Sequence, residues 1–276
     1  MKKTLALLLL IFSCLSPARA GKLTRYVDPM IGTTNFSVCN PGAVVPHGLM
    51  TVTPFNVMGS DLNKYDKDKR WWSAAYEYHN VYMTGFAHVT LSGVGCPEMG
   101  TLLTMPTTGK LEVDCRHYGS DYDQETARPG YYAVRLKKYG VKCEMTSTLR
   151  SSRERYTFPK GEGHILINIG DGLTNEVGGS VRRVSDTEIE GFRLLGTFCY
   201  NPQAVFPMYF VVRVNKKPSS SGFWKLQPKT GGAQSQWDPD YGKYKLYTHY
   251  GRDLAGDRVG CFFNYDFTDS TAVEVS

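Results

Sequence analysis

The feature that most limits the fold is a succession of short runs with two-residue alternation, separated by turn residues, without any long 3.6-residue periodicity. Residues 131–138 and 142–148 flank Tyr139-Gly140, which predicts a hairpin turn. Further strands are predicted at residues 164–169, 188–200, 206–214, 243–250 and 258–267. Many strands joined by Gly and Pro turns favour an all-β fold, namely a large antiparallel β-sandwich.

Two stretches of the sequence are predicted to be long loops. Residues 56–73 are polar and charged, and residues 218–240 are rich in Ser, Gly, Pro and Gln and carry Trp224 and Trp237. Loops of this length are uncommon inside a compact domain and are often functional. No repeat and no Pro-rich linker divides the chain, so residues 21–276 are predicted to form one domain.

The first 20 residues have the pattern of an export signal. Lys2-Lys3 is followed by an apolar run at residues 5–12 and by Ala18-Arg19-Ala20, which matches the small-x-small pattern at a cleavage site. We expect cleavage after Ala20 and a periplasmic or secreted product, and N-terminal sequencing of the exported chain checks this. A lipoprotein anchored through Cys14 is less favoured because Phe12 is bulky, and a mature product beginning at a lipid-modified Cys14 would contradict the expectation.

Charge and cysteine content narrow the class of protein. The net charge of +6 comes from scattered Lys and Arg without a basic stripe, which argues against nucleic acid as a partner. The apolar run at the N-terminus is too short to span a bilayer, and no second one follows. Cleavage after Ala20 leaves six cysteines at wide spacings, which does not favour zinc. Disulfides and buried free thiols both remain open.

The sequence lacks the standard catalytic signatures, among them the nucleophile elbow, the Walker loop and His-Glu-x-x-His. Asp121, Asp123 and Glu125 alternate as calcium ligands can, but a solvated acidic turn is the better interpretation. Glycosidases usually need a pair of carboxylic acids, and 26 Asp and Glu residues make chance pairs uninformative. No catalytic acid or base is named from the residues alone.

An aromatic and His-rich segment is the most informative feature for function. Trp71-Trp72, Tyr76, Tyr78 and His79 precede a glycine-rich stretch at residues 85–96. Sugars stack their C–H faces on aromatic rings, and glycines let the backbone approach a ligand closely. The alternative interpretation is an aromatic core with a glycine-rich turn.

Six sequence blocks are informative when they are taken together and in order. They are VDPMIGT at 27–33, PGAVVPHG at 41–48, GFAHVTLSGVGCPEMG at 85–100, ARPGYY at 127–132, RYTFP at 155–159 and IEGF at 189–192. These blocks resemble glycoside hydrolase family 92, the family of bacterial exported α-mannosidases, and they keep the family's order over residues 26–270, nearly the whole mature chain.

The resemblance implies a two-domain, calcium-dependent enzyme that hydrolyses α-mannosides with inversion. In this family an N-terminal, supersandwich-like β-sandwich precedes a catalytic (α/α)6 barrel, and the sugar site lies where they meet. The acid, the base and the calcium ligands belong to the barrel. We therefore expect residues 21–276 to be the N-terminal β-sandwich, truncated at its C-terminal end, without catalytic or metal-binding residues and inactive alone.

The resemblance also implies which residues of the sandwich contact mannose-containing glycans. These expected substrate-binding residues are Trp72, His88, Gly95 and Cys96. Residues 35–40 depart from the Gly- and His-rich stretch of many members, which leaves the linkage preference open.

Three functional interpretations remain open at this point. The chain is an enzyme fragment, or a stand-alone secreted carbohydrate-binding or interaction module, or one half of a split enzyme whose catalytic barrel is encoded separately. Because the predicted last strand reaches the final residue, Ser276, we favour the enzyme fragment.

Overall fold

The computed structural model describes residues 23–34, 38–57, 74–93, 99–173, 176–195, 205–227, 242–248 and 251–276. The helices among these residues are the 3-10 turn η2 (Thr24–Tyr26) and the one-turn α3 (Cys115–Tyr118). The strands are β1 (Ala43–Val44), β2 (Thr51–Phe55), β3 (Tyr82–Met83), β4 (Gly85–His88), β5 (Leu103–Thr108), β6 (Ser120–Arg128), β7 (Tyr131–Leu136), β8 (Val141–Ser147), β9 (Ser152–Phe158), β10 (Gly161–Asn168), β11 (Glu176–Ser185), β12 (Glu188–Leu195), β13 (Phe206–Arg213), β14 (Ser220–Leu226), β15 (Tyr244–Tyr247), β16 (Asp253–Gly256), β17 (Val259–Phe267) and β18 (Thr271–Val275).

The first layer of the molecule is an eight-stranded antiparallel sheet with the order β1-β2-β4-β5-β10-β17-β14-β15. Residues directly opposite one another on paired antiparallel strands point to the same face of a sheet. The register therefore aligns Phe86, Thr104, Ile167, Cys261 and Phe223 on one face. The buried runs of β10 and β17 show that this sheet is covered on both faces along its middle strands.

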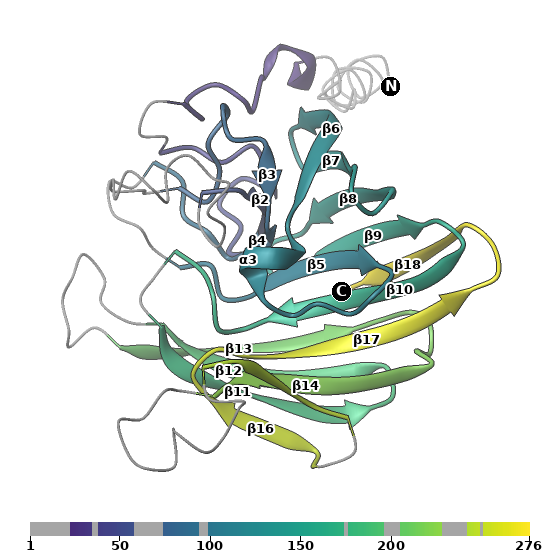
Figure 1. Cartoon of the computed structure of the whole chain (residues 1–276). Coiled ribbons are helices and arrows are strands. Elements are labelled where there is room, and N and C mark those ends of the chain that lie inside the picture. The colour runs from purple at the N-terminus through teal and green to yellow at the C-terminus, as the bar shows by residue number, and fades with distance from the viewer. Residues whose placement is uncertain are drawn as a thin grey trace, which may run out of the picture.

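The second layer consists of two smaller sheets that cover the same face of the large sheet. At the six-stranded sheet, β18-β9-β8-β7-β6-β3, Tyr156 stacks on Phe86 with ring centroids 6.1 Å apart. At the four-stranded sheet, β13-β12-β11-β16, Arg183 lies 5.6 Å from the ring centroid of Phe223. In Figure 1, β6, β7 and β8 lie in the upper half of the molecule and β11, β12 and β16 in the lower half.

The two smaller sheets meet near the last strand. Val214 forms an isolated antiparallel bridge with Val275. Arg213 and Ser276 exchange backbone hydrogen bonds of 2.7 and 2.9 Å. The second layer is thus almost continuous, and the molecule is an antiparallel β-sandwich, as the sequence predicts.

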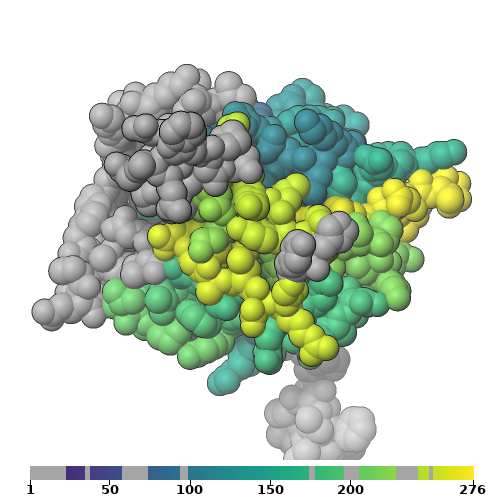
Figure 2. Space-filling model, turned by 60° about the horizontal axis from the view of Figure 1, so that its bottom comes forward, coloured from purple at the N-terminus to yellow at the C-terminus, as the bar shows by residue number. Residues whose placement is uncertain are grey.

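At one side of the molecule, the hairpin turns that join β9 to β10 and β17 to β18 project together (Figures 1 and 2). Next to these turns, Ser270 Oγ donates to the carbonyl of Phe158 at 3.1 Å.

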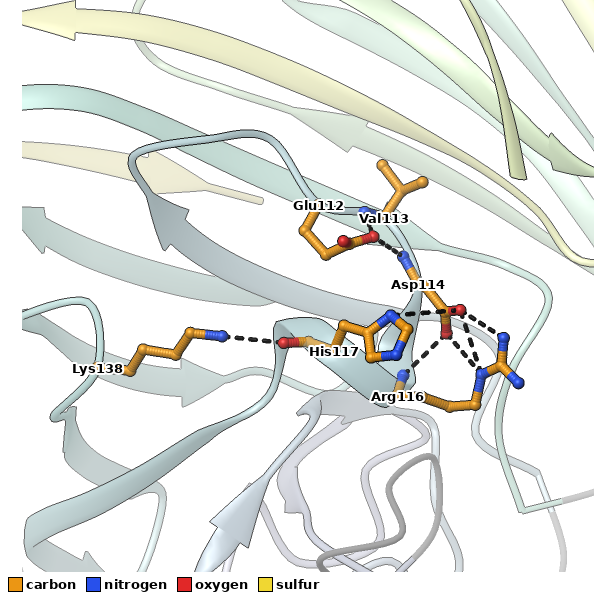
Figure 3. Close-up of polar contacts among 6 residues, drawn as sticks. All are labelled: Glu112, Val113, Asp114, Arg116, His117 and Lys138. Atoms are coloured by element: carbon orange, nitrogen blue, oxygen red, sulfur yellow. Dashed lines mark hydrogen bonds and ion pairs between the residues drawn. The ribbon is translucent and has the colours of Figure 1, made fainter. Parts of the chain in front are cut away.

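The outer face of the large sheet is covered in part by α3, because Asn168 Nδ2 of β10 donates to the Tyr118 hydroxyl at 3.0 Å. A single helical turn has little stability of its own. Asp114 caps α3 by accepting a 3.0 Å hydrogen bond from the Arg116 amide (Figure 3). At the other end, Lys138 Nζ donates to the His117 carbonyl at 2.9 Å.

Most predicted strands are confirmed, including the hairpin at residues 139–140, where Gly140 has a φ of 64°. The loop predicted at residues 218–240 is wrong for its first part, because β14 runs through Ser220–Leu226 and buries Trp224 completely. Phe223 and Trp224 are adjacent in β14 and both are buried, so the sequence of this strand does not show the two-residue alternation that predicts a strand. Residues 228–241 and most of the loop predicted at 56–73 lie outside the described residues.

The acidic turn predicted around Asp121, Asp123 and Glu125 is also wrong, because all three residues belong to β6. Asp121 and Asp123 pair with Lys137 and Arg135 on the surface. Within the described residues, Cys115, Cys143 and Cys261 are buried free thiols. Cys96 and Cys199 lie outside the described residues.

Candidate functional site

The glycine-rich segment leaves the large sheet at the end of β4 and returns at the start of β5. Its base, which we define as residues 88–91 and 99–102, is closed by the bridge between Thr90 and Met99. The Gly100 amide donates to the Val89 carbonyl at 3.0 Å, and the Thr101 amide donates to the His88 carbonyl at 2.8 Å. Gly95 and Cys96, which were expected to contact substrate, lie outside the described residues, as does Trp72.

His88 points into the sandwich, because it shares a face of the large sheet with Phe86. Only 5 % of His88 is exposed. Its Nε2 lies 2.6 Å from Glu154 Oε1, and its Nδ1 lies 3.3 Å from the Leu102 carbonyl oxygen. Both ring nitrogens therefore face acceptors, which is the arrangement that a doubly protonated imidazolium satisfies.

Glu154 is the partner of His88 across the two layers, and only 1 % of it is exposed. It lies on β9, where Glu154, Tyr156 and Phe158 alternate inward. Its Oε2 accepts a 2.5 Å hydrogen bond from Thr104 Oγ1 and another from the Tyr156 hydroxyl. The carboxylate is thus satisfied on both oxygens, as a buried charge must be.

The two pKa shifts agree with a charged pair. Burial alone would lower the pKa of His88, but the Glu154 carboxylate and the Leu102 carbonyl hold it above its ordinary value. Burial alone would raise the pKa of Glu154, but the His88 imidazolium and the hydroxyls of Thr104 and Tyr156 hold it below its ordinary value. A glycosidase general acid needs a raised pKa. Glu154 is therefore suited to hold His88 and not to protonate a leaving group.

A pocket of about 280 Å³ opens next to this pair. Its floor includes His88 and Glu154, and one wall is formed by residues 208–212 of β13. Leu49, Tyr209 and Val211 are exposed apolar residues on its lining. An apolar pocket with a small number of convergent polar groups has the general character of a ligand site.

The aromatic segment that follows Trp72 is largely buried. The Tyr76 hydroxyl donates to Glu125 Oε2 at 3.1 Å, and the Tyr132 hydroxyl donates to Glu125 Oε1 at 2.6 Å. Burial raises the pKa of Glu125 although both hydroxyls oppose it. Glu77, which follows Tyr76, is held by the side chain of Asn56. Asn56 Oδ1 accepts from the Glu77 amide at 2.8 Å, and Asn56 Nδ2 donates to the Glu77 carbonyl at 2.9 Å. For Tyr76 the structure supports the aromatic-core interpretation, whereas Tyr78 is 51 % exposed.

Sequence reasoning missed Glu154 and Arg193 as residues near the glycine-rich segment. Arg193 is 1 % exposed, and its Nη1 donates to the carbonyls of Gly100 and Asp171, both at 2.9 Å. The signal was present in the alternation of β12, which turns Ile189, Arg193 and Leu195 inward together. Inward positions of a strand are usually apolar, so a charged residue at such a position needs a structural or functional reason.

The fold defines a two-layer antiparallel β-sandwich domain, with the glycine-rich segment inserted between β4 and β5. The sequence model described as "Glycosyl hydrolase family 92 N-terminal domain" matches residues 26–276. The chain belongs to this family.

Solved structures with the same fold include a family GH92 α-mannosidase from Bacteroides thetaiotaomicron. It is 27 % identical, with a TM-score of 0.73, and the match covers 92 % of this chain and 32 % of that chain. The same mannosidase in complex with mannoimidazole gives a TM-score of 0.72 at 27 % identity over the same shares of the two chains. A family GH92 inverting mannosidase from Bacteroides thetaiotaomicron VPI-5482 shares the fold, with 18 % identity, a TM-score of 0.64 and coverage of 92 % and 31 %.

A relative known from its sequence is an uncharacterized secreted glycosidase of Arthroderma benhamiae. It is 30 % identical over 167 residues, which are 55 % of this chain and 20 % of that protein. The chain therefore spans about a fifth of this glycosidase and about a third of the solved mannosidases. Within the described residues, no helix is long and apolar enough to cross a membrane.

Proposed function

We propose that this chain is the carbohydrate-contacting N-terminal portion of an exported, inverting, calcium-dependent α-mannosidase that acts on mannose-containing glycans. The observation that carries the proposal is the family match over residues 26–276, supported by a mannosidase fold that covers 92 % of the chain. The glycine-rich segment and the adjoining pocket supply the sugar-contacting surface, with Trp72, His88, Gly95 and Cys96 as its proposed residues.

In this proposal the chemistry is supplied by the catalytic barrel, either in a longer chain or as a separately encoded partner. Among the described residues, no group of three or more His, Cys, Asp and Glu side chains is placed to hold a metal ion. Calcium is proposed to bind in the catalytic domain, as the family resemblance implies. The signal peptide at residues 1–20 directs the protein to the periplasm or the exterior.

The second candidate is a stand-alone secreted module that binds glycans without hydrolysing them. The pocket of about 280 Å³ beside the His88–Glu154 pair favours it, because this pocket lies within the chain itself. The two candidates differ in sugar affinity. Half of a shared site immobilises a ligand poorly and gives roughly millimolar binding or none, whereas a complete module binds more tightly.

The experiment is a mannose-release assay on the purified chain, with and without a chelator, combined with titration calorimetry against α-mannosides. We expect no turnover, because the carboxylate pair that hydrolyses the glycosidic bond is supplied by another domain. Turnover that chelation abolishes would contradict the proposal. Micromolar binding without turnover would favour the stand-alone module.

A further inference from the structure

The base of the glycine-rich segment contains three residues in the left-handed region of backbone conformation. Val89 has a φ of 57°, Met99 of 66° and Gly100 of 79°. Glycine adopts this region freely, but a β-branched valine there is a genuine outlier. Such conformations persist only where surrounding contacts over-determine them, and they cluster at functional sites. The contacts that hold Val89 are therefore informative.

Three groups of contacts hold this base from different sides. The side chain of His88, which precedes Val89, is fixed by Glu154 from the six-stranded sheet. Thr51 Oγ1 of β2 accepts from the Thr90 amide at 2.7 Å, so the residue after Val89 is fixed as well. Arg193 of the four-stranded sheet donates to the Gly100 carbonyl on the returning strand.

The three groups come from three different sheets, and two of them are charged groups buried almost completely. A buried charge is costly unless it is fully satisfied, and mutual satisfaction requires the groups to stay in place. Uncharged side chains at positions 154 and 193 could fill the same volume without needing partner groups at fixed positions. The charges therefore fix one geometry more strictly than packing does.

We infer that Glu154, acting through His88, and Arg193, acting through Gly100, are positioning residues that hold the strained base of the glycine-rich segment in a single conformation. The inference rests on the proposed function in taking this segment as part of the sugar site. It adds that the conformation of this base depends on the charge state of a buried pair, and hence on pH.

The charged pair exists within a defined pH window. The pKa of His88 is raised above its ordinary value of 6.5, so the contribution of the imidazolium is complete below 6.5 and is lost as pH rises through the higher folded pKa. The pKa of Glu154 is lowered below its ordinary value of 4.5, so its contribution is complete above 4.5 and is lost as pH falls through the lower folded pKa. The base is therefore held most firmly between pH 4.5 and 6.5.

Two other titratable side chains near the pair stay neutral within this window. Burial raises the pKa of Tyr156 on β9 and of Cys143 on β8 well above their ordinary values. The other charged or titratable side chains on the pocket lining are those of Arg150 and Tyr209.

The test is hydrogen exchange of the full chain at several pH values, read at the amides of His88, Gly100 and Thr101, which donate within the base. Val181, buried in the middle strand β11 of the four-stranded sheet, serves as the reference amide. In Glu154→Gln the amide oxygen can still accept from His88, but the amide NH2 can only donate to the hydroxyl oxygens of Thr104 and Tyr156. Because the charge is also gone, we expect protection of the three amides to fall about tenfold or more at pH 6, as for lost bonds to charged groups. The pH dependence of their protection should also disappear.

The matched control is Glu144→Gln, which removes a carboxylate from the outward face of the neighbouring strand, where it pairs with Lys142. We expect this variant to keep the protection of the base and its pH dependence. Equal loss of protection at the base and at Val181 in Glu154→Gln would mean a purely structural role and would overturn the inference. An unchanged base would do the same.

A second measurement keeps the inference testable if Glu154→Gln fails to fold. The ring nitrogen resonances of His88 in the unaltered chain should show an imidazolium at pH 6 and should titrate together with exchange at Gly100. A neutral ring at pH 6 would overturn the inference. Turnover of α-mannosides by the unaltered chain that chelation abolishes would count against the proposed function alone, because the exchange results decide the positioning roles separately.

Discussion

Replacing Glu154 by alanine is expected to lower the free energy of unfolding by about 3–5 kcal/mol at pH 6, since one partner of a buried ion pair is lost. The His88 imidazolium, 2.6 Å from the Glu154 carboxylate, would remain buried without a counter-ion. The hydroxyls of Thr104 and Tyr156 would lose their acceptor at the same time. For a domain of this size the midpoint of thermal unfolding should fall by roughly 10 °C. Urea unfolding and calorimetry measure both quantities.

The control for this variant is Glu144→Ala, which removes a carboxylate whose side chain is 22 % exposed and pairs with Lys142 on the surface. We expect a change of about 1 kcal/mol or less there. The effect of Glu154→Ala should also shrink at pH 9, because the raised pKa of His88 means that the imidazolium contribution is lost as pH rises. Equal destabilisation by the two variants at pH 6 would show that the buried pair contributes no more than a surface one.

Replacing Trp224 by alanine is expected to destabilise the fold by about 3–5 kcal/mol, the range for large aromatic residues removed from a core. Trp224 is 0 % exposed and packs against Gly260 on β17. A Cβ at Gly260 would lie 2.1 Å from Trp224 Cζ2, so the indole occupies the space that a side chain there would need. Alanine would therefore leave a cavity that the glycine cannot fill. Equilibrium unfolding in urea measures the loss.

Leu246 is the matched control, because it is the cross-strand neighbour of Trp224 on β15 and is 42 % exposed. Leu246→Ala should cost about 1 kcal/mol or less, as expected for a residue that stays partly in water in the folded state. A Trp224→Ala variant as stable as Leu246→Ala would mean that β14 is not part of the core. That result would support the loop that the sequence predicts at residues 218–240.

The strands could largely be predicted from the sequence because alternation is a local property. In β8, the residues from Val141 to Ser147 alternate between buried and exposed, and the same two-residue period is readable in the sequence. The resemblance to family 92 also depends on short contiguous blocks, as does the export signal, which stays a prediction. The family assignment over residues 26–276 follows from those blocks without any coordinates.

The candidate site could be predicted only in part. His88, Trp72, Gly95 and Cys96 were all named from the resemblance to family 92. Their contact with sugar stays a prediction, and the last three lie outside the described residues. Glu154 lies two residues before Tyr156, and Arg193 lies four residues after Ile189, so each charged residue falls on the same inward face as a buried neighbour in its strand. The two-residue period of the sequence could have revealed both. The sequence contains no signal for which residue each of them meets.

The sequence by itself determined the β-rich class, the inward and outward faces of individual strands, and the family. The tertiary structure alone decided that the two smaller sheets share one face of the large sheet, and that Trp224 belongs to the core. It also decided that His88 meets Glu154, 66 residues further along the chain. The physical reason is that alternation sets the side of a strand on which a residue lies, whereas strand pairing and layer packing set its partner. These depend on contacts between distant segments, which no local pattern encodes.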